Sequence, residues 1–211
     1  MKVSQSFSLV QREVTVTAPD SQESKQGSAE LCVAPWKCKN QWCQGCSKHL
    51  MAVFRDQFRP IVNEWSFGQM ITLTVDPKQF DGPEQAFDFF RTDRTIAKLM
   101  QQLRRKGVLI GPEWICVLEF QKNGWPHWHI LVHSKFIPVQ LIREGWRYGR
   151  IDITKSCQFK THGHAFNYLT KYIGKFENSA VPGWVLRRAR VRRYSTSRGL
   201  KVQATRAMVE E

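Results

Sequence analysis

The chain has 211 residues, of which 42% are hydrophobic, so it is long enough to bury one substantial core. Its 32 Lys and Arg outnumber its 18 Asp and Glu, and the net charge of +14 favours a polyanionic partner, most commonly nucleic acid. No segment approaches the roughly 18 to 20 apolar residues of a membrane span, and residues 1–20 contain no apolar secretion signal, so we expect a cytoplasmic protein without a membrane partner.

The N-terminal part of the chain divides into two regions. Residues 1–30 are rich in Ser, Gln and Glu, which predicts a weakly ordered arm. Residues 31–60 contain a cysteine cluster and then a helix, expected over 50–58 and ending near Pro60.

The cluster consists of Cys32, Cys38, Cys43 and Cys46. Four thiolates can hold a structural Zn²⁺ in a tetrahedral site, and the Cys43-Gln-Gly-Cys46 knuckle is typical of such sites. His49 could replace Cys32, and reduced thiols without a metal are the alternative.

From residue 61 to residue 182 the pattern alternates between strands and helices, which predicts an α+β core. The predicted strands cover 65–75, 114–120, 127–133 and 149–154, and the predicted helices cover 83–106, 138–145 and 163–176. Gly107 should end the long helix, because basic residues favoured at a helix C-terminus precede it. The second and third strands should form a β-hairpin, since an Asn-Gly turn separates them.

The hairpin carries a candidate metal site. His127 and His129 lie two residues apart, so both imidazoles leave one face of the strand while Trp128 leaves the other. Two imidazoles and a carboxylate can hold a divalent cation and leave positions open for substrate. Glu119 can supply the carboxylate only if it pairs opposite a histidine, which requires an odd loop, such as a three-residue turn with a bulge. We predict such a loop; a purely structural histidine pair is the alternative.

A second candidate site lies on the helix expected over 163–176. One arc of this helix carries two tyrosines, each with a lysine three residues later: Tyr168, Lys171, Tyr172 and Lys175. A separate arc is apolar and contains Phe166, Leu169, Ile173 and Phe176. The apolar arc can dock on a sheet while the tyrosines face a groove; an ordinary amphipathic surface helix is the alternative.

These two segments resemble motifs of the HUH endonuclease superfamily. Residues 126–132 resemble its histidine-hydrophobic-histidine signature, and the doubled Tyr-x-x-Lys pattern is similar to the two-tyrosine motif of rolling-circle replication initiators from single-stranded DNA phages and related elements. Residues 67–74 resemble the first motif of that family. The resemblance implies a ferredoxin-like domain with a central antiparallel sheet flanked by helices. It also implies that Glu119, eight residues before His127, is the third metal ligand.

The resemblance further implies metal-dependent nicking and rejoining of single-stranded DNA at a replication origin, which can be a hairpin. With Mg²⁺ or Mn²⁺ bound, we expect Tyr168 to form a 5′-phosphotyrosine and Tyr172 to take the second cleavage. Lys171 and Lys175 would contact phosphate or assist the phenols. Because the chain lacks an NTPase phosphate-binding loop, a host helicase and polymerase are expected partners. The location would be the host cytoplasm if a phage or plasmid encodes the protein.

The stretch from Gly183 to Arg206 has eight Lys or Arg and no acid, so we expect residues 183–211 to form a basic segment that tracks phosphates. The expected contacts are Arg187, Arg188, Arg190, Arg192, Arg193 and Arg198. Tryptophans next to basic residues could stack unpaired bases, namely Trp125, Trp146 and Trp184. A solubilising tail is the alternative for the basic segment.

Two rival functions fit the same sequence. A related HUH transposase or relaxase would differ in its DNA substrate. A zinc-containing nucleic-acid-binding protein without catalysis would bind DNA but form no covalent adduct.

Overall fold

The computed structural model describes residues 40–43, 46–154, 166–167, 169–171, 181–188 and 191–200. All of these belong to one compact unit, Lys37–Glu211. The arm expected over residues 1–30 lies outside the described residues. The helices are α1 (Ser47–Asn63), α2 (Pro83–Asp93), α3 (Thr95–Arg105), α4 (Val139–Gly145) and α6 (Gly183–Arg187), with a short 3₁₀ turn at Pro77–Gln79. The strands are β1 (Gln69–Thr74), β2 (Trp114–Phe120), β3 (Pro126–Val132), β4 (Ile151–Thr154) and β5 (Tyr194–Thr196).

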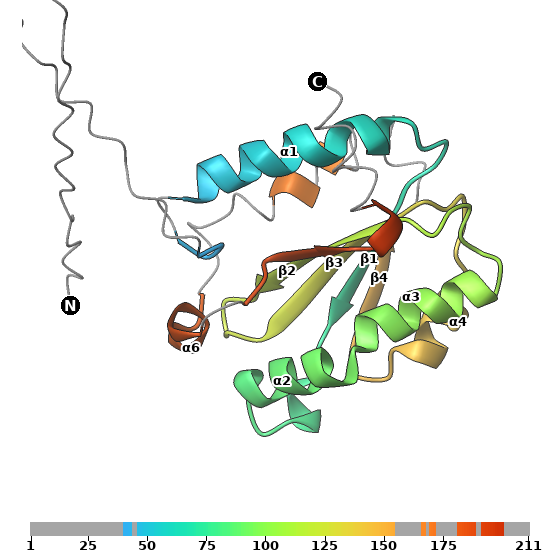
Figure 1. Cartoon of the computed structure of the whole chain (residues 1–211). Coiled ribbons are helices and arrows are strands. Elements are labelled where there is room, and N and C mark those ends of the chain that lie inside the picture. Colours follow the sequence, from blue (N-terminus) through green and yellow to red (C-terminus); the bar gives the residue numbers. More distant parts are fainter. Residues whose placement is uncertain are drawn as a thin grey trace, which may run out of the picture. The chain divides into compact units, whose positions relative to one another are not determined.

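The five strands form one sheet in the order β4-β1-β3-β2-β5, and each neighbouring pair is antiparallel. Helix α1 lies on one side of this sheet, and α2, α3 and α4 lie on the other side (Figure 1). The predicted α+β class, with a central antiparallel sheet flanked by helices, is confirmed, and the arrangement is compatible with a ferredoxin-like HUH fold.

Alternate side chains of each central strand enter two separate cores. On the first face, here called the α1 face, strand residues such as Met70 and Val117 pack against Phe54 and Phe58 of α1. On the second, the α2–α3 face, the sheet packs against aromatic and aliphatic residues of α2, α3 and α4. That core includes Ile71, Leu73, Leu118, Trp128 and Ile130 from the strands and Phe87, Phe90, Leu99, Leu103 and Ile142 from the helices.

The single helix expected over 83–106 is wrong, because the chain forms two helices separated by Arg94. Arg94 has a left-handed backbone with φ of 56°, which ends α2 and begins α3. The Asp93 carboxylate accepts hydrogen bonds from Thr95 (2.8 Å) and Lys98 (2.5 Å) and so helps to hold the start of α3. Gly107, with φ of 70°, follows α3 as expected.

The expected end of α1 near Pro60 is also wrong, since the helix continues through Pro60 to Asn63. A proline inside a helix removes one backbone hydrogen bond and costs about 3 kcal/mol. Beyond it, Val62 and Trp65 are buried on the α1 face at 1% and 4% exposure. Burying each such side chain contributes roughly 1.5–3 kcal/mol, which offsets the loss.

Residues 183–200, expected as a separate basic segment, contribute to the same core. Trp184 and Val185 of α6 are buried on the α2–α3 face, and β5 pairs with β2 at the edge of the sheet. Among the described residues, no helix combines the length and apolar character that crossing a membrane requires.

Candidate metal centre

The β2–β3 hairpin places Glu119 directly opposite His127, and Val117 opposite His129. Gln121 donates its backbone N–H to the carbonyl of Trp125 (2.9 Å), so three residues, 122–124, form the turn. Gly124 has φ of 82°, the left-handed conformation that such a bulged turn requires and that glycine adopts without steric cost. The odd loop predicted from the sequence is therefore confirmed, and all three side chains share the α1 face.

The three side chains come together as candidate ligands. One nitrogen or oxygen atom from each of Glu119, His127 and His129 lies within 4.8 Å of the others. Nε2 of His129 is 3.0 Å from Oε2 of Glu119, and the two imidazole centroids are 4.6 Å apart. His129 is buried at 3% exposure, whereas the Glu119 side chain retains 19%.

Strand β1 orients both imidazoles through two threonine hydroxyls. Oγ1 of Thr72 is 3.2 Å from Nδ1 of His129, and Oγ1 of Thr74 is 3.2 Å from Nδ1 of His127. Both contacts join residues paired across the β1–β3 register. Fixing Nδ1 in this way leaves Nε2 of each ring to ligate a metal, the arrangement in which outer partners tune metal sites. Sequence reasoning missed this role, although the alternation of Thr72 and Thr74 along β1 was its signal.

The environment keeps His127 in the form that a metal ligand needs. Burial lowers the pKa of His127 to about 4, and the neighbouring His129 lowers it further, while Glu119 opposes the shift. His127 is therefore neutral at neutral pH and carries a lone pair, as ligation requires.

A cavity of about 340 Å³ opens onto this cluster and is lined by Glu119, Phe120, Gln121, Lys122 and His127. Two imidazole nitrogens and one carboxylate oxygen fit a divalent first-row ion, and three protein ligands leave coordination positions for a substrate oxygen. Lys122 adds positive charge at the cavity wall. The residues present therefore fit a divalent cation together with an anionic substrate.

The expected nucleophiles Tyr168 and Tyr172, with Lys175, lie outside the described residues. Their described neighbours, Phe166, Asn167 and Leu169–Lys171, are helical and are here called the Phe166 segment. As predicted for the apolar arc, Phe166 and Leu169 are buried.

The Phe166 segment packs on the α1 face. The ring of Phe166 stacks on Phe54 at 5.6 Å, and Arg59 of α1 donates a 2.9 Å hydrogen bond to Asn167. Lys171 is exposed. The segment thus docks on the sheet face that carries Glu119, His127 and His129.

The predicted zinc cluster is described only in part. Cys43 and Cys46 lie at the start of α1 and are half-buried, and His49 is exposed. Cys32 and Cys38 lie outside the described residues, so the four-thiolate site stays a prediction.

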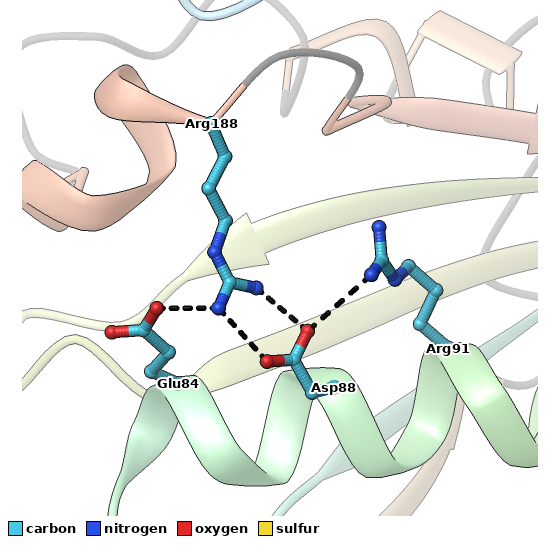
Figure 2. Close-up of polar contacts among 4 residues, drawn as sticks. All are labelled: Glu84, Asp88, Arg91 and Arg188. Carbon is cyan, nitrogen blue, oxygen red and sulfur yellow. Dashed lines mark hydrogen bonds and ion pairs between the residues drawn. The ribbon is translucent and has the colours of Figure 1, made fainter.

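The six arginines expected to contact DNA fall into different environments. Arg187, Arg192 and Arg198 are exposed, and Arg190 lies outside the described residues. Arg188 instead joins α6 to α2 (Figure 2). It donates hydrogen bonds of 2.6 and 2.9 Å to the two oxygens of Asp88 and one of 2.5 Å to Glu84.

Arg193 has 0% exposure, so in this structure its side chain is not presented to DNA as expected. Its guanidinium lies 4.9 Å from the ring centroid of Trp42, and its backbone N–H donates to Gln41 (2.7 Å). Burial lowers the pKa of Arg193 to about 10, and Glu119 opposes this shift. Charge composition indicated a basic surface here but could not separate the buried arginine from its exposed neighbours.

Two of the tryptophans proposed to stack bases are core residues. Trp146 and Trp184 are buried at 2% and 8% exposure on the α2–α3 face, so the expectation of base stacking is wrong for them. Trp125 is half-buried beside the hairpin turn.

No curated protein and no solved structure matches the chain significantly. The sequence model of one family, the replication-associated protein ORF2 family, matches residues 68–177. This region begins just before β1 and contains the Glu119–His127–His129 cluster and the Phe166 segment, and it covers just over half of the chain. The chain therefore belongs to the replication-associated protein ORF2 family.

Proposed function

We propose that this protein is a rolling-circle replication initiator of the two-tyrosine HUH type, which nicks and rejoins single-stranded DNA at an origin. The observation that carries the proposal is the convergence of Glu119, His127 and His129 on the sheet face where the Phe166 segment docks. Family membership supports a role in DNA replication with nucleic acid as the partner.

Glu119, His127 and His129 would hold the cation, and the hydroxyls of Thr72 and Thr74 would orient the imidazoles. A bound Mn²⁺ or Mg²⁺ neutralises charge on a scissile phosphate and orients it for in-line attack. The mixed nitrogen and oxygen donors favour Mn²⁺ over Mg²⁺, because Mg²⁺ prefers oxygen ligands alone.

In the proposed reaction the Tyr168 oxygen forms a bond to phosphorus while the bond from phosphorus to the 3′ oxygen breaks. The phenol proton passes overall to the departing oxygen, which leaves a 5′-phosphotyrosine and a 3′ hydroxyl that can prime synthesis. A phenol has an unperturbed pKa near 10, so Lys171 and Lys175 are proposed to stabilise the developing phenolate or the phosphate. Tyr172 would perform the second cleavage that permits rejoining.

The remaining features supply DNA binding. Arg187, Arg192 and Arg198 are exposed and would contact phosphates. A structural Zn²⁺ held by Cys32, Cys38, Cys43 and Cys46 is proposed for the N-terminal region. A host helicase and polymerase in the host cytoplasm would complete replication.

The test is formation of a covalent protein–DNA adduct. The protein is incubated with Mn²⁺ and a pool of single-stranded oligonucleotides and examined on a denaturing gel. Wild type should form the adduct, Tyr168→Phe plus Tyr172→Phe should not, and the matched control Tyr148→Phe, in the aromatic core, should retain it. An adduct from the double variant would refute the nucleophile assignment, and DNA binding without any adduct would favour the non-catalytic alternative.

A further inference from the structure

A second cavity, of about 320 Å³, lies on the α2–α3 face and is here called the arginine pocket. Its floor includes Cys116 and Leu118 of β2 and Trp128 of β3, and its wall includes Phe90 and Ile96. Leu118 and Trp128 are the immediate chain neighbours of Glu119 and His127, which point to the opposite face. The arginine pocket and the metal centre are therefore separated by the thickness of the sheet.

The pocket has the size and lining of a site for one flat ring system. Ligand pockets span roughly 300–1,000 Å³ and are lined mostly by apolar and aromatic side chains with a few polar groups. Here the apolar surface comes from Phe87, Phe90 and Trp128 among others, and the polar groups include Ser195 of β5. Every nucleobase has a face that can stack on such aromatic side chains.

The charged residues that line the pocket are all basic: Arg91, Arg192 and Arg193. Arg91 and Arg192 are exposed and can reach a ligand at the mouth. This combination of an apolar slot and positive charge is complementary to a base that carries its phosphate.

The neighbouring acidic residue does not neutralise this charge. A guanidinium nitrogen of Arg91 is 3.7 Å from Asp88, beyond hydrogen-bonding distance, whereas Arg188 engages both oxygens of Asp88 at 2.6 and 2.9 Å (Figure 2). The charge of Asp88 is thus matched mainly by Arg188, and Arg91 can turn toward another anion.

The edge of the sheet offers a path between the two sites. β5 is the edge strand, only three residues long, and Tyr194 pairs with Val117 of β2. Arg192 precedes β5 on the side toward Glu119, because the two strands are antiparallel. A DNA strand held at the metal centre can therefore pass around this edge, along Arg192, to the other face.

We propose that the arginine pocket binds one unstacked base of the single-stranded DNA substrate, with an adjacent phosphate on Arg91 and Arg192. The inference rests on the proposed function in taking single-stranded DNA as the ligand. It places a second DNA contact on the sheet face opposite the metal centre, so that the substrate wraps around β5.

The experiment measures DNA binding in EDTA, where nicking plays no part, by fluorescence anisotropy with labelled single-stranded oligonucleotides. Ile96→Trp should fill the pocket and weaken binding about tenfold to a hundredfold, the loss expected for one stacked base. Arg91→Ala should lower the slope of log affinity against log salt by about 1, as for one phosphate contact. Arg105→Ala, an exposed arginine of α3 outside the pocket lining, is the matched control and should retain wild-type pocket behaviour.

A scan with abasic nucleotides then identifies the bound base. One abasic position should weaken binding to wild type and have little further effect on Ile96→Trp or Arg91→Ala. If every abasic position affects wild type and both variants equally, the pocket does not hold a base. Because Arg91 is exposed, its variant gives this result even if Ile96→Trp fails to fold.

The same measurements separate this inference from the proposed function. A wild-type protein that forms covalent adducts but shows no abasic coupling overturns the arginine pocket alone. A protein that shows the coupling but forms no adduct overturns the proposed nicking alone.

Discussion

The two faces of the sheet are built from different kinds of side chain. At the hairpin end of the α1 face, five neighbouring positions are polar: Thr72, Thr74, Glu119, His127 and His129. At the same level of β2 and β3, the α2–α3 face carries Leu118, Phe120 and Trp128 in a continuous apolar core. The comparison teaches that one pair of strands supplies chemistry on one face and cohesion on the other. Substitutions at adjacent residues should therefore have different consequences.

The largest expected effect is on folding stability when the apolar side is truncated. Trp128→Ala should reduce the free energy of unfolding by about 3–5 kcal/mol, because a large buried ring is lost and a cavity remains. Its neighbour His127→Ala should cost much less stability but should abolish the rise in melting temperature that Mn²⁺ gives wild type. Urea unfolding and thermal melts with and without Mn²⁺ check both, and equal destabilisation by the two variants would contradict the comparison.

Acid should destabilise the α1 face through His127. The folded protein has a His127 pKa of about 4, against 6.5 for the ordinary side chain, so the unfolded state binds more protons between these values. Stability should therefore fall as pH decreases from 6.5 toward 4 and lose up to about 3 kcal/mol from this group. Guanidinium unfolding in EDTA at several pH values measures the loss. His127→Gln should flatten this part of the profile, and an unchanged profile would refute the role of His127.

The threonines should tune the metal centre without building it. Thr72→Val keeps the side-chain shape but removes the hydroxyl next to Nδ1 of His129, so Mn²⁺ affinity should fall about tenfold to a hundredfold. Isothermal titration calorimetry measures this change. Thr196→Val, on the edge strand β5, is the control and should bind Mn²⁺ like wild type. Equal affinity in Thr72→Val and wild type would show that β1 does not orient the ligand.

The smallest expected effect concerns the ion pairs at the rim of the α2–α3 face. Arg188→Ala removes contacts with Asp88 and Glu84, but these groups are partly exposed, so the loss should be about 1 kcal/mol or less and should shrink in salt. Chemical denaturation with the exposed neighbour Arg187→Ala as control measures it. A loss as large as that of Trp128→Ala would mean that α6 is held mainly by this cluster.

The predictability of each region follows from how strictly local geometry constrains it. Along a strand, side chains alternate with a period of two, so the spacing of His127 and His129 fixed their common face and the needed position of Glu119 fixed an odd loop. Both features are present in the structure. The predicted metal itself, and the tyrosine chemistry, stay proposals.

Features set by tertiary context escaped the sequence. The apolar spacing continues across Arg94, so the left-handed residue that divides α2 from α3 left no break in the pattern. Pro60 has a strong local effect, yet packing beyond it carried the helix onward. Arg188 and Arg193 differ from Arg187 and Arg192 only in what surrounds them after folding, which charge composition does not encode.

The bulged turn at 122–124 makes the centre sensitive to the parity of its length. Adding or deleting one residue there would turn one strand over relative to the other and send the acid and the imidazoles to opposite sides. A change of two residues would preserve their meeting. Insertions and deletions in this turn should thus be tolerated in even steps only, a constraint on how descendants of this gene can vary that concerns length alone and is independent of which amino acids fill the turn.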